Sequence, residues 1–158
     1  MRHFKFEEFR CKCCGELPSF AKENIEALVD RVLDKARARF GKPVYVNSGY
    51  RCAKHNREVG GAANSQHCCS LGSAAADITA GSREENLKLA AAIVKGGDWD
   101  QMIIYVGKND LLPKWVHVSW KRNGANRREV RKHVLGTGPI YPKLTAEEMG
   151  SEELRDNS

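Results

Sequence analysis

Two histidines and one aspartate lie far apart in the chain, each in a segment that reads as a strand or a strand edge. His67 follows a polar loop, and Asp77 ends a run of three alanines. His117 stands between Val116 and Val118, so its side chain lies on the strand face opposite those valines. Two imidazoles and a carboxylate that leave one coordination position open are typical of a catalytic zinc site. The three residues together predict a metal centre that can do chemistry.

Each of these histidines taken alone fits a hydrogen-bonded core residue better than a metal ligand, so the prediction depends on the three residues jointly. The remaining histidines are His3 near the N-terminus, His55 in a polar loop and His133 at the end of a basic stretch. Such positions are typical of surface residues, and we assign these three no chemistry.

Cysteines form a second group of potential ligands, at positions 11, 13, 14, 52, 68 and 69. The chain is neither very small nor visibly secreted, so reduced thiols or a small structural metal site are expected rather than disulfides. The turn at residues 11–15 could hold zinc, with Cys52 completing the ligand set, but it has no CxxC partner at a standard distance. Buried small residues that fasten the N-terminus to the core are an equally good explanation.

Length, composition and charge indicate one soluble globular domain. The chain has 158 residues, of which 41% are hydrophobic and 29% charged, enough for a core without disulfides. The net charge of +6 favours anionic partners, such as a cell wall, a membrane surface or nucleic acid. No run is long and apolar enough to span a bilayer. Acidic residues among the first nine positions do not fit a signal peptide, so we expect cytoplasmic synthesis without one.

Hydrophobic periodicity predicts the elements that must position this chemistry. Helices are expected over 20–39, with Ser19 as N-cap, and over 83–95, with Ser82 and Glu85 as a capping box. Strands are expected at 44–47, 74–78, 101–106 and 114–120, and the polar stretch 52–66 reads as a loop.

These elements predict an α+β domain in residues 1–142, in which an antiparallel sheet carries the zinc site and helices flank it. Residues 143–158 are polar and acidic with little to bury, and we expect a flexible C-terminal tail there.

Several short motifs follow one another in order along the first 120 residues. They are Ser48-Gly49-Tyr50-Arg51, residues 56–61, Ser65-Gln66-His67, Ala75-Ala76-Asp77-Ile78, Asp100-Gln101 and Trp115-Val116-His117-Val118-Ser119. This set resembles the zinc D-Ala-D-Ala carboxypeptidase family, which shares its fold with the hedgehog signalling domain and with vancomycin-resistance D,D-dipeptidases. The opening at residues 6–15 also resembles a branch common among phage and prophage proteins. An ordered set of motifs is more specific than a lone metal motif.

The resemblance implies roles for individual residues. It makes His67, Asp77 and His117 the ligands of Zn²⁺ as cofactor. It makes Arg51 the cation that receives a substrate carboxylate, with Ser65 as a nearby hydrogen-bonding residue. The planar fork of arginine suits a carboxylate, although a structural salt bridge is an alternative role for Arg51.

One departure from the family pattern concerns the spacing of the ligands. Nine residues separate His67 from Asp77, more than the family usually has. The extra residues could bulge outward and leave both ligands in place. They could instead destroy the site, or bring Cys68 or Cys69 to the metal, because thiolates bind zinc well.

A second departure concerns the general base. Many relatives place an acid three residues before the last histidine, where this chain has Lys114. Asp110 is the nearest acid and the candidate base, although an ordinary turn aspartate is the simpler explanation.

The resemblance therefore implies a zinc metallopeptidase that cleaves peptidoglycan stem peptides, as a D,D-carboxypeptidase or an endopeptidase, in the manner of a phage endolysin. We expect a monomer that acts on the cell wall when it is released or phage-delivered. The alternative is a non-catalytic zinc domain that binds cell wall or a protein partner. Nucleic acid is not expected as a partner, because the basic stretch 121–133 contains no interleaved aromatic residues.

Overall fold

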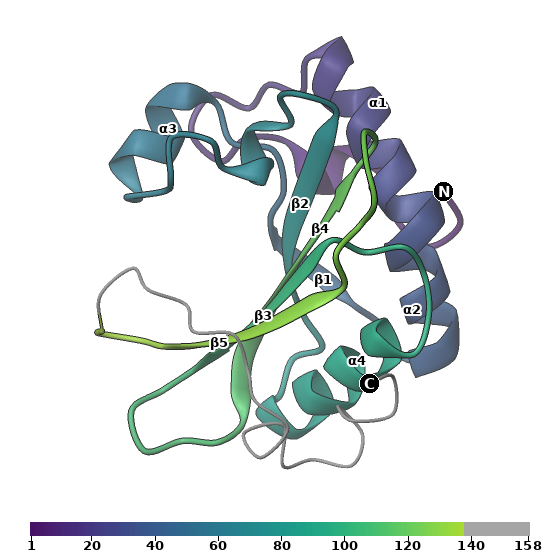
Figure 1. Ribbon diagram of the computed structural model, residues 1–158, viewed down its shortest axis with the longest axis vertical. Helices are drawn as coiled ribbons and strands as arrows, with labels where there is room; N and C mark the ends of the chain where they lie inside the picture. Colours follow the sequence, from purple (N-terminus) through teal and green to yellow (C-terminus); the bar gives the residue numbers. More distant parts are fainter. Residues whose placement is uncertain (138–158) are drawn as a thin grey trace.

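A five-stranded sheet with helices packed against one face forms the described part of the chain (Figure 1). The structure is a computed structural model and describes residues 1–137; the predicted tail at 143–158 lies outside the described residues. The strands in sheet order are β1 (Tyr45–Ser48), β2 (Ser73–Thr79), β4 (Pro113–Lys121), β3 (Gln101–Val106) and β5 (Glu129–Val134). The α+β class is confirmed.

The sheet is antiparallel from β1 to β3, but its last pair departs from the expected antiparallel arrangement, since β5 runs parallel to β3. The reason is the direction of β4. Because β4 is antiparallel to β3, its end lies beside the start of β3, and the chain that leaves it enters the sheet edge there. The amide of Glu129 accordingly donates to the carbonyl of Asp100 at 3.0 Å.

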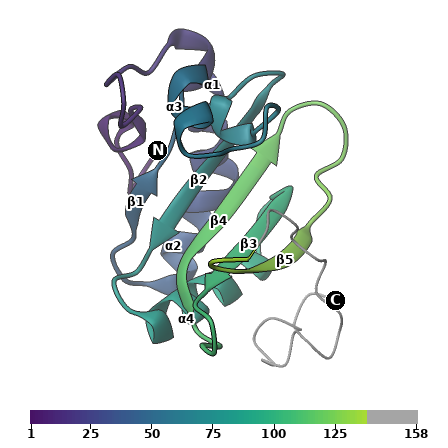
Figure 2. The same cartoon turned by 90° about the vertical axis from the view of Figure 1, so that its left-hand side faces the viewer.

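Three helices cover one face of the sheet, and the opposite face, termed the open face, carries none of these helices. The helical segment predicted at 20–39 consists of α1 (Ser19–Leu28), a π-helical turn (Val29–Leu33) and α2 (Asp34–Phe40), and α4 (Arg83–Val94) follows β2. Figure 2 views the molecule from the open side, with α1 and α2 behind the strands. None of the described helices is long and apolar enough to cross a membrane.

Two local predictions were wrong. Ser19 is the first residue of α1 rather than its cap, and Pro18 precedes the helix without a capping side chain. The stretch predicted as a loop contains the short helix α3 (Ala53–Glu58), capped by the sulfur of Cys52. The residues of α3 are almost all polar and therefore show no hydrophobic periodicity. Ser82, by contrast, caps α4 as expected, because its hydroxyl accepts from the Glu85 amide. The predicted capping box is only half formed, since the Glu85 carboxylate pairs with Lys42 and Lys88.

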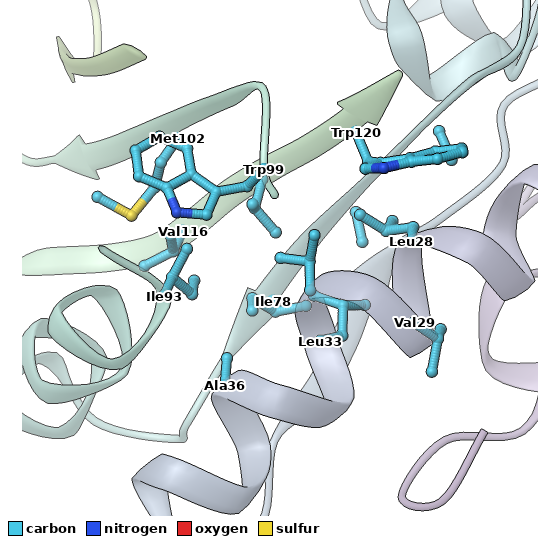
Figure 3. Packing of buried hydrophobic residues seen from close by; sticks show 14 of the residues in the cluster. Leu28, Val29, Leu33, Ala36, Ile78, Ile93, Trp99, Met102, Val116 and Trp120 are labelled. Atoms are coloured by element: carbon cyan, nitrogen blue, oxygen red, sulfur yellow. The ribbon is translucent and has the colours of Figure 1, made fainter. Parts of the chain in front are cut away.

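Alternation along the central strands decides which side chains enter the core. The inward residues of β2 and β4 are at most 4% exposed; they are Ala74, Ala76, Ile78, Val116, Val118 and Trp120. Figure 3 shows Leu28 and Leu33 of the helical segment packed toward Ile78 and Trp120. Since successive side chains of a strand point to opposite faces, this burial turns the intervening residues of β2 and β4 onto the open face.

Asp100 fastens the start of β3 to the chain that leads into β5. Its side chain is only 1% exposed, and it accepts hydrogen bonds from the backbone amide, Nε and Nη2 of Arg127 at 2.9–3.0 Å. It also accepts from Gln66 Nε2 at 3.0 Å, next to His67. Burial alone would raise the pKa of this carboxyl, but the Arg127 and Gln66 donors outweigh burial and lower the pKa to about 2.

We expect Asp100→Asn to lower the free energy of unfolding by about 3 kcal/mol at pH 7, because it leaves the donors of Arg127 without their charged partner. The pKa of Asp100 is depressed in the folded chain, so its stabilisation is present above about pH 4 and is lost as the pH falls toward about 2. Denaturant unfolding of both proteins at pH 7 and at low pH measures this. The exposed Asp98→Asn is the matched control. A loss that does not shrink on acidification would contradict the assignment.

Candidate metal centre

His67, Asp77 and His117 come together on the open face of the sheet. Asp77 on β2 pairs directly with His117 on β4, and His67 belongs to the 3₁₀ turn Gln66–Cys68 that precedes β2. Asp77 Oδ1 lies 3.0 Å from His117 Nδ1 and 3.3 Å from His67 Nε2. The two imidazole nitrogens are 3.1 Å apart. One ion could therefore contact all three side chains.

The loop between β1 and α3 orients His67. The ring is 1% exposed, and its Nδ1 lies 2.8 Å from the carbonyl oxygen of Gly49. The amide of Arg51 donates to the His67 carbonyl at 2.8 Å. With the Nδ1 proton assigned to the Gly49 carbonyl, the lone pair of Nε2 faces Asp77 and His117. A ring nitrogen held by a backbone carbonyl is the usual support of a metal-binding histidine.

The spacing and protonation of the three groups fit zinc. In a tetrahedral site with bonds of about 2.0–2.1 Å, ligand atoms lie about 3.3 Å apart, and the three separations here are 3.0–3.3 Å. Burial would raise the pKa of Asp77, but the two histidines outweigh it and hold that pKa well below its usual range. Burial, with the charges of His67 and Arg51, lowers the pKa of His117 although Asp77 acts to raise it. An ionised carboxylate and a neutral imidazole are the forms that bind metals.

The extra residues between His67 and Asp77 bulge away from this group. Cys69 and Leu71 adopt positive φ angles, and Leu71 is 89% exposed at the tip of the bulge. The thiol of Cys69 is buried, which raises its pKa to about 12, and its sulfur lies 3.6 Å from the His67 carbonyl oxygen. Neither Cys68 nor Cys69 belongs to the group of His67, Asp77 and His117. Of the three possibilities left open by the spacing, the structure shows the outward bulge.

Arg51 lies beside the group with a guanidinium that no carboxylate of residues 1–137 neutralises. Its Nη2 donates to Ser65 Oγ at 3.4 Å, and its buried Nε makes no hydrogen bond. No ion pair of Arg51 occurs within residues 1–137, so the structural salt bridge considered as an alternative is not formed there. The positive charge of Arg51 contributes to the lowered pKa of His117. This guanidinium is therefore free to receive an anion next to the candidate metal ligands.

Asn56 and Gly61 lie beside the side chain of Arg51 and limit the space around it. Both residues belong to a polar stretch of the sequence that gave no indication of this role. The side-chain Nδ2 of Asn56 donates to the Ala62 carbonyl at 2.8 Å and ties the chain that follows α3 back to this helix. A Cβ on Gly61 would lie 2.0 Å from Asn56 Oδ1 and 3.2 Å from Arg51 Nη1. The motif resemblance included this segment, but only the close approach of the backbone explains why a glycine is needed.

Asp110, the candidate base, lies in the turn between β3 and β4. Its carboxylate pairs with Arg83 and accepts from the amide of Leu112 at 3.0 Å. It is not part of the group of His67, Asp77 and His117. Lys114 is exposed. The contacts of Asp110 are those of a turn residue, and its role as general base stays a prediction.

The comparison with protein families identifies the region that contains the site. The model of the family described as Peptidase M15 matches residues 2–119, a range that includes every residue of the candidate centre. A search of curated proteins finds no match.

We expect His67→Ala to remove one equivalent of bound zinc per chain, because losing a ligand should weaken zinc binding by more than about 100-fold. Zinc content after loading and gel filtration measures this. His3→Ala, which changes an exposed histidine, is the control and should keep its full zinc content. Equal zinc content in His67→Ala and the unmodified protein would disprove the centre.

Proposed function

The chain belongs to the peptidase M15 family, a family of metallopeptidases, and from this premise we propose that it cleaves the stem peptides of bacterial peptidoglycan with zinc as its cofactor. One arrangement supports this proposal. Two imidazoles and a carboxylate meet on the open face of the sheet, and the guanidinium of Arg51 lies beside them without an ion-pair partner among the described carboxylates. A metal-binding group next to an anion-binding group suits hydrolysis of a peptide bond near a carboxylate.

Zinc is the proposed occupant, held by His67 Nε2, Asp77 Oδ1 and His117 Nδ1. When bound, this metal supplies a Lewis acid for the carbonyl and lowers the pKa of water to about 7. The hydrogen bond from His67 Nδ1 to the Gly49 carbonyl keeps Nε2 directed at the metal. Asp77 stays ionised near neutral pH, since its pKa is held far below the ordinary value.

Arg51 is the proposed anchor for a carboxylate of the peptide. Its fork can donate two parallel hydrogen bonds to a carboxylate, and Ser65 Oγ accepts from Nη2 and limits rotation of the guanidinium. The net charge of +6 would favour approach to an anionic wall polymer. We do not propose Asp110 as the general base, because its carboxylate already pairs with Arg83 and accepts from the Leu112 amide.

We expect the zinc-loaded protein to release new amino groups from purified peptidoglycan, and His117→Ala to reduce that release to background. Free D-alanine as product would indicate a D,D-carboxypeptidase, whereas cross-links opened without free amino acid would indicate an endopeptidase. His3→Ala again serves as the control. Zinc bound at the centre with no turnover on either substrate form would favour the alternative, a non-catalytic domain that binds cell wall or a protein.

We expect Arg51→Ala to raise KM about 10- to 100-fold for a stem peptide with a free C-terminal carboxylate, because a charge-assisted hydrogen bond contributes about 1.5–3 kcal/mol. A C-terminally amidated peptide should bind the unmodified protein correspondingly less well and should be little affected by the substitution. Steady-state kinetics on both peptides measures the difference. Arg57→Ala, an exposed arginine of α3, is the matched control. An equal loss on both peptides would show that Arg51 does not read the carboxylate.

A further inference from the structure

A second cluster of metal-ligand side chains lies where the N-terminal segment meets the start of α3. The sulfur atoms of Cys11, Cys14 and Cys52 lie within 4.8 Å of one another, and all three cysteines are free thiols. Cys11 is buried, Cys52 is half-buried and Cys14 is exposed. This cluster shares no residue with the group of His67, Asp77 and His117. Three thiols from segments about forty residues apart have thus converged without forming a disulfide.

The backbone around these sulfurs has the form of two metal-binding turns. Cys11 and Cys14 have C-x-x-C spacing, and Gly15 closes their turn with a φ of +73° while its amide donates to the Cys11 carbonyl at 2.8 Å. Cys52 and His55 have C-x-x-H spacing, and the His55 amide donates to Cys52 Sγ at 3.4 Å. Paired turns with these ligand types are typical of structural zinc sites.

Backbone amides are aimed at the sulfur of Cys11. The amide of Cys52 lies 3.5 Å from Cys11 Sγ, which joins the two turns directly. The amides of Cys13 and Cys14 also donate to this sulfur. Donors directed at sulfur stabilise the thiolate, which is the form that binds a metal.

His55 is the side chain best placed to complete the set. Its imidazole lies in an adjoining group with Cys13 and Glu58, whose ligand atoms are also within 4.8 Å of one another. Its ring makes no hydrogen bond within residues 1–137. His55 and Cys52 lie on one turn, so rotation about the side-chain bonds of His55 can direct its imidazole toward Cys52. Cys13 directly precedes Cys14, and neighbouring side chains in a turn diverge.

We propose that Cys11, Cys14, Cys52 and His55 bind a second, structural zinc ion. A closed set of three thiolates and one imidazole leaves no position for substrate. The ion would cross-link the N-terminal segment to the loop between β1 and α3. Phe9 already contacts this loop so closely that a Cβ on Gly49 would lie 2.7 Å from Phe9 Cα. The cross-link would therefore hold the loop that carries Arg51 and the carbonyl that orients His67.

Zinc content and cobalt spectra of the full chain test the proposal. The unmodified protein should bind two zinc ions per chain, and Cys52→Ser and His67→Ala should each bind one. Cobalt loaded into His67→Ala should show thiolate-to-metal charge transfer, and that band should be absent from Cys52→Ser. Cys68→Ser changes a half-buried thiol outside the cluster and should keep both ions. Because His67→Ala removes the proposed catalytic ion alone, failure of one site is distinguishable from failure of the other.

A measurement on the unmodified protein covers the case in which Cys52→Ser does not fold. Zinc should slow alkylation of Cys14 and Cys52 by at least about tenfold, because a metal-bound thiolate is not free to react, and should leave Cys13 and Cys68 unprotected. Equal alkylation with and without zinc, or a disulfide between Cys11 and Cys52 in the native protein, would overturn the proposal. Cobalt spectra that change in Cys13→Ser but not in His55→Ala would overturn the choice of the fourth ligand.

Discussion

The 2.8 Å contact between His67 Nδ1 and the carbonyl oxygen of Gly49 links the candidate metal centre to the loop between β1 and α3. Two further backbone hydrogen bonds restrain the same loop. The Arg51 amide donates to the His67 carbonyl, and the Tyr50 amide donates to the Phe9 carbonyl. One short segment thus orients a proposed zinc ligand, presents the guanidinium beside it and packs against the N-terminal segment. The geometry of the candidate centre therefore depends on this segment.

The hydrophobic core and the metal centre share one constraint. Ala76 and Ile78 face the helices, so Asp77 must face the open side of β2, and Val116 and Val118 place His117 on the same side of β4. A slip of one residue in the pairing would bury the carboxylate among apolar side chains. The packing that makes the sheet stable therefore also sets the register at which the carboxylate and the imidazole meet.

Charge is distributed unevenly around the site. Asp77 lies between two histidines, whereas Asp100 is neutralised by Arg127 and supports the turn that carries His67 through Gln66. Asp100 is paired for stability, and the guanidinium next to the centre has no such partner within residues 1–137. The ion pair of Asp100 with Arg127 therefore stabilises the fold, whereas the guanidinium of Arg51 is available to a ligand.

Local pattern by itself determined the class of the fold, and the resemblance of its motifs to a known family implied the three candidate ligands that the structure brings together. Short runs of small or apolar residues located β2 and β3, alternation around His117 located β4, each within about a residue, and the order of the motifs implied which histidines to combine with Asp77. These features depend on near neighbours in the chain, which is why they can be read from the sequence.

Only the tertiary structure decided the outward bulge before β2, the parallel pairing of β5, the helix α3, the pairing of Asp110 with Arg83 and the meeting of Cys52 with Cys11. Each of these depends on backbone conformation or on contacts between segments that are far apart in the chain. Such contacts arise from the register and packing of the whole domain, for which a short stretch of sequence carries no periodic signal.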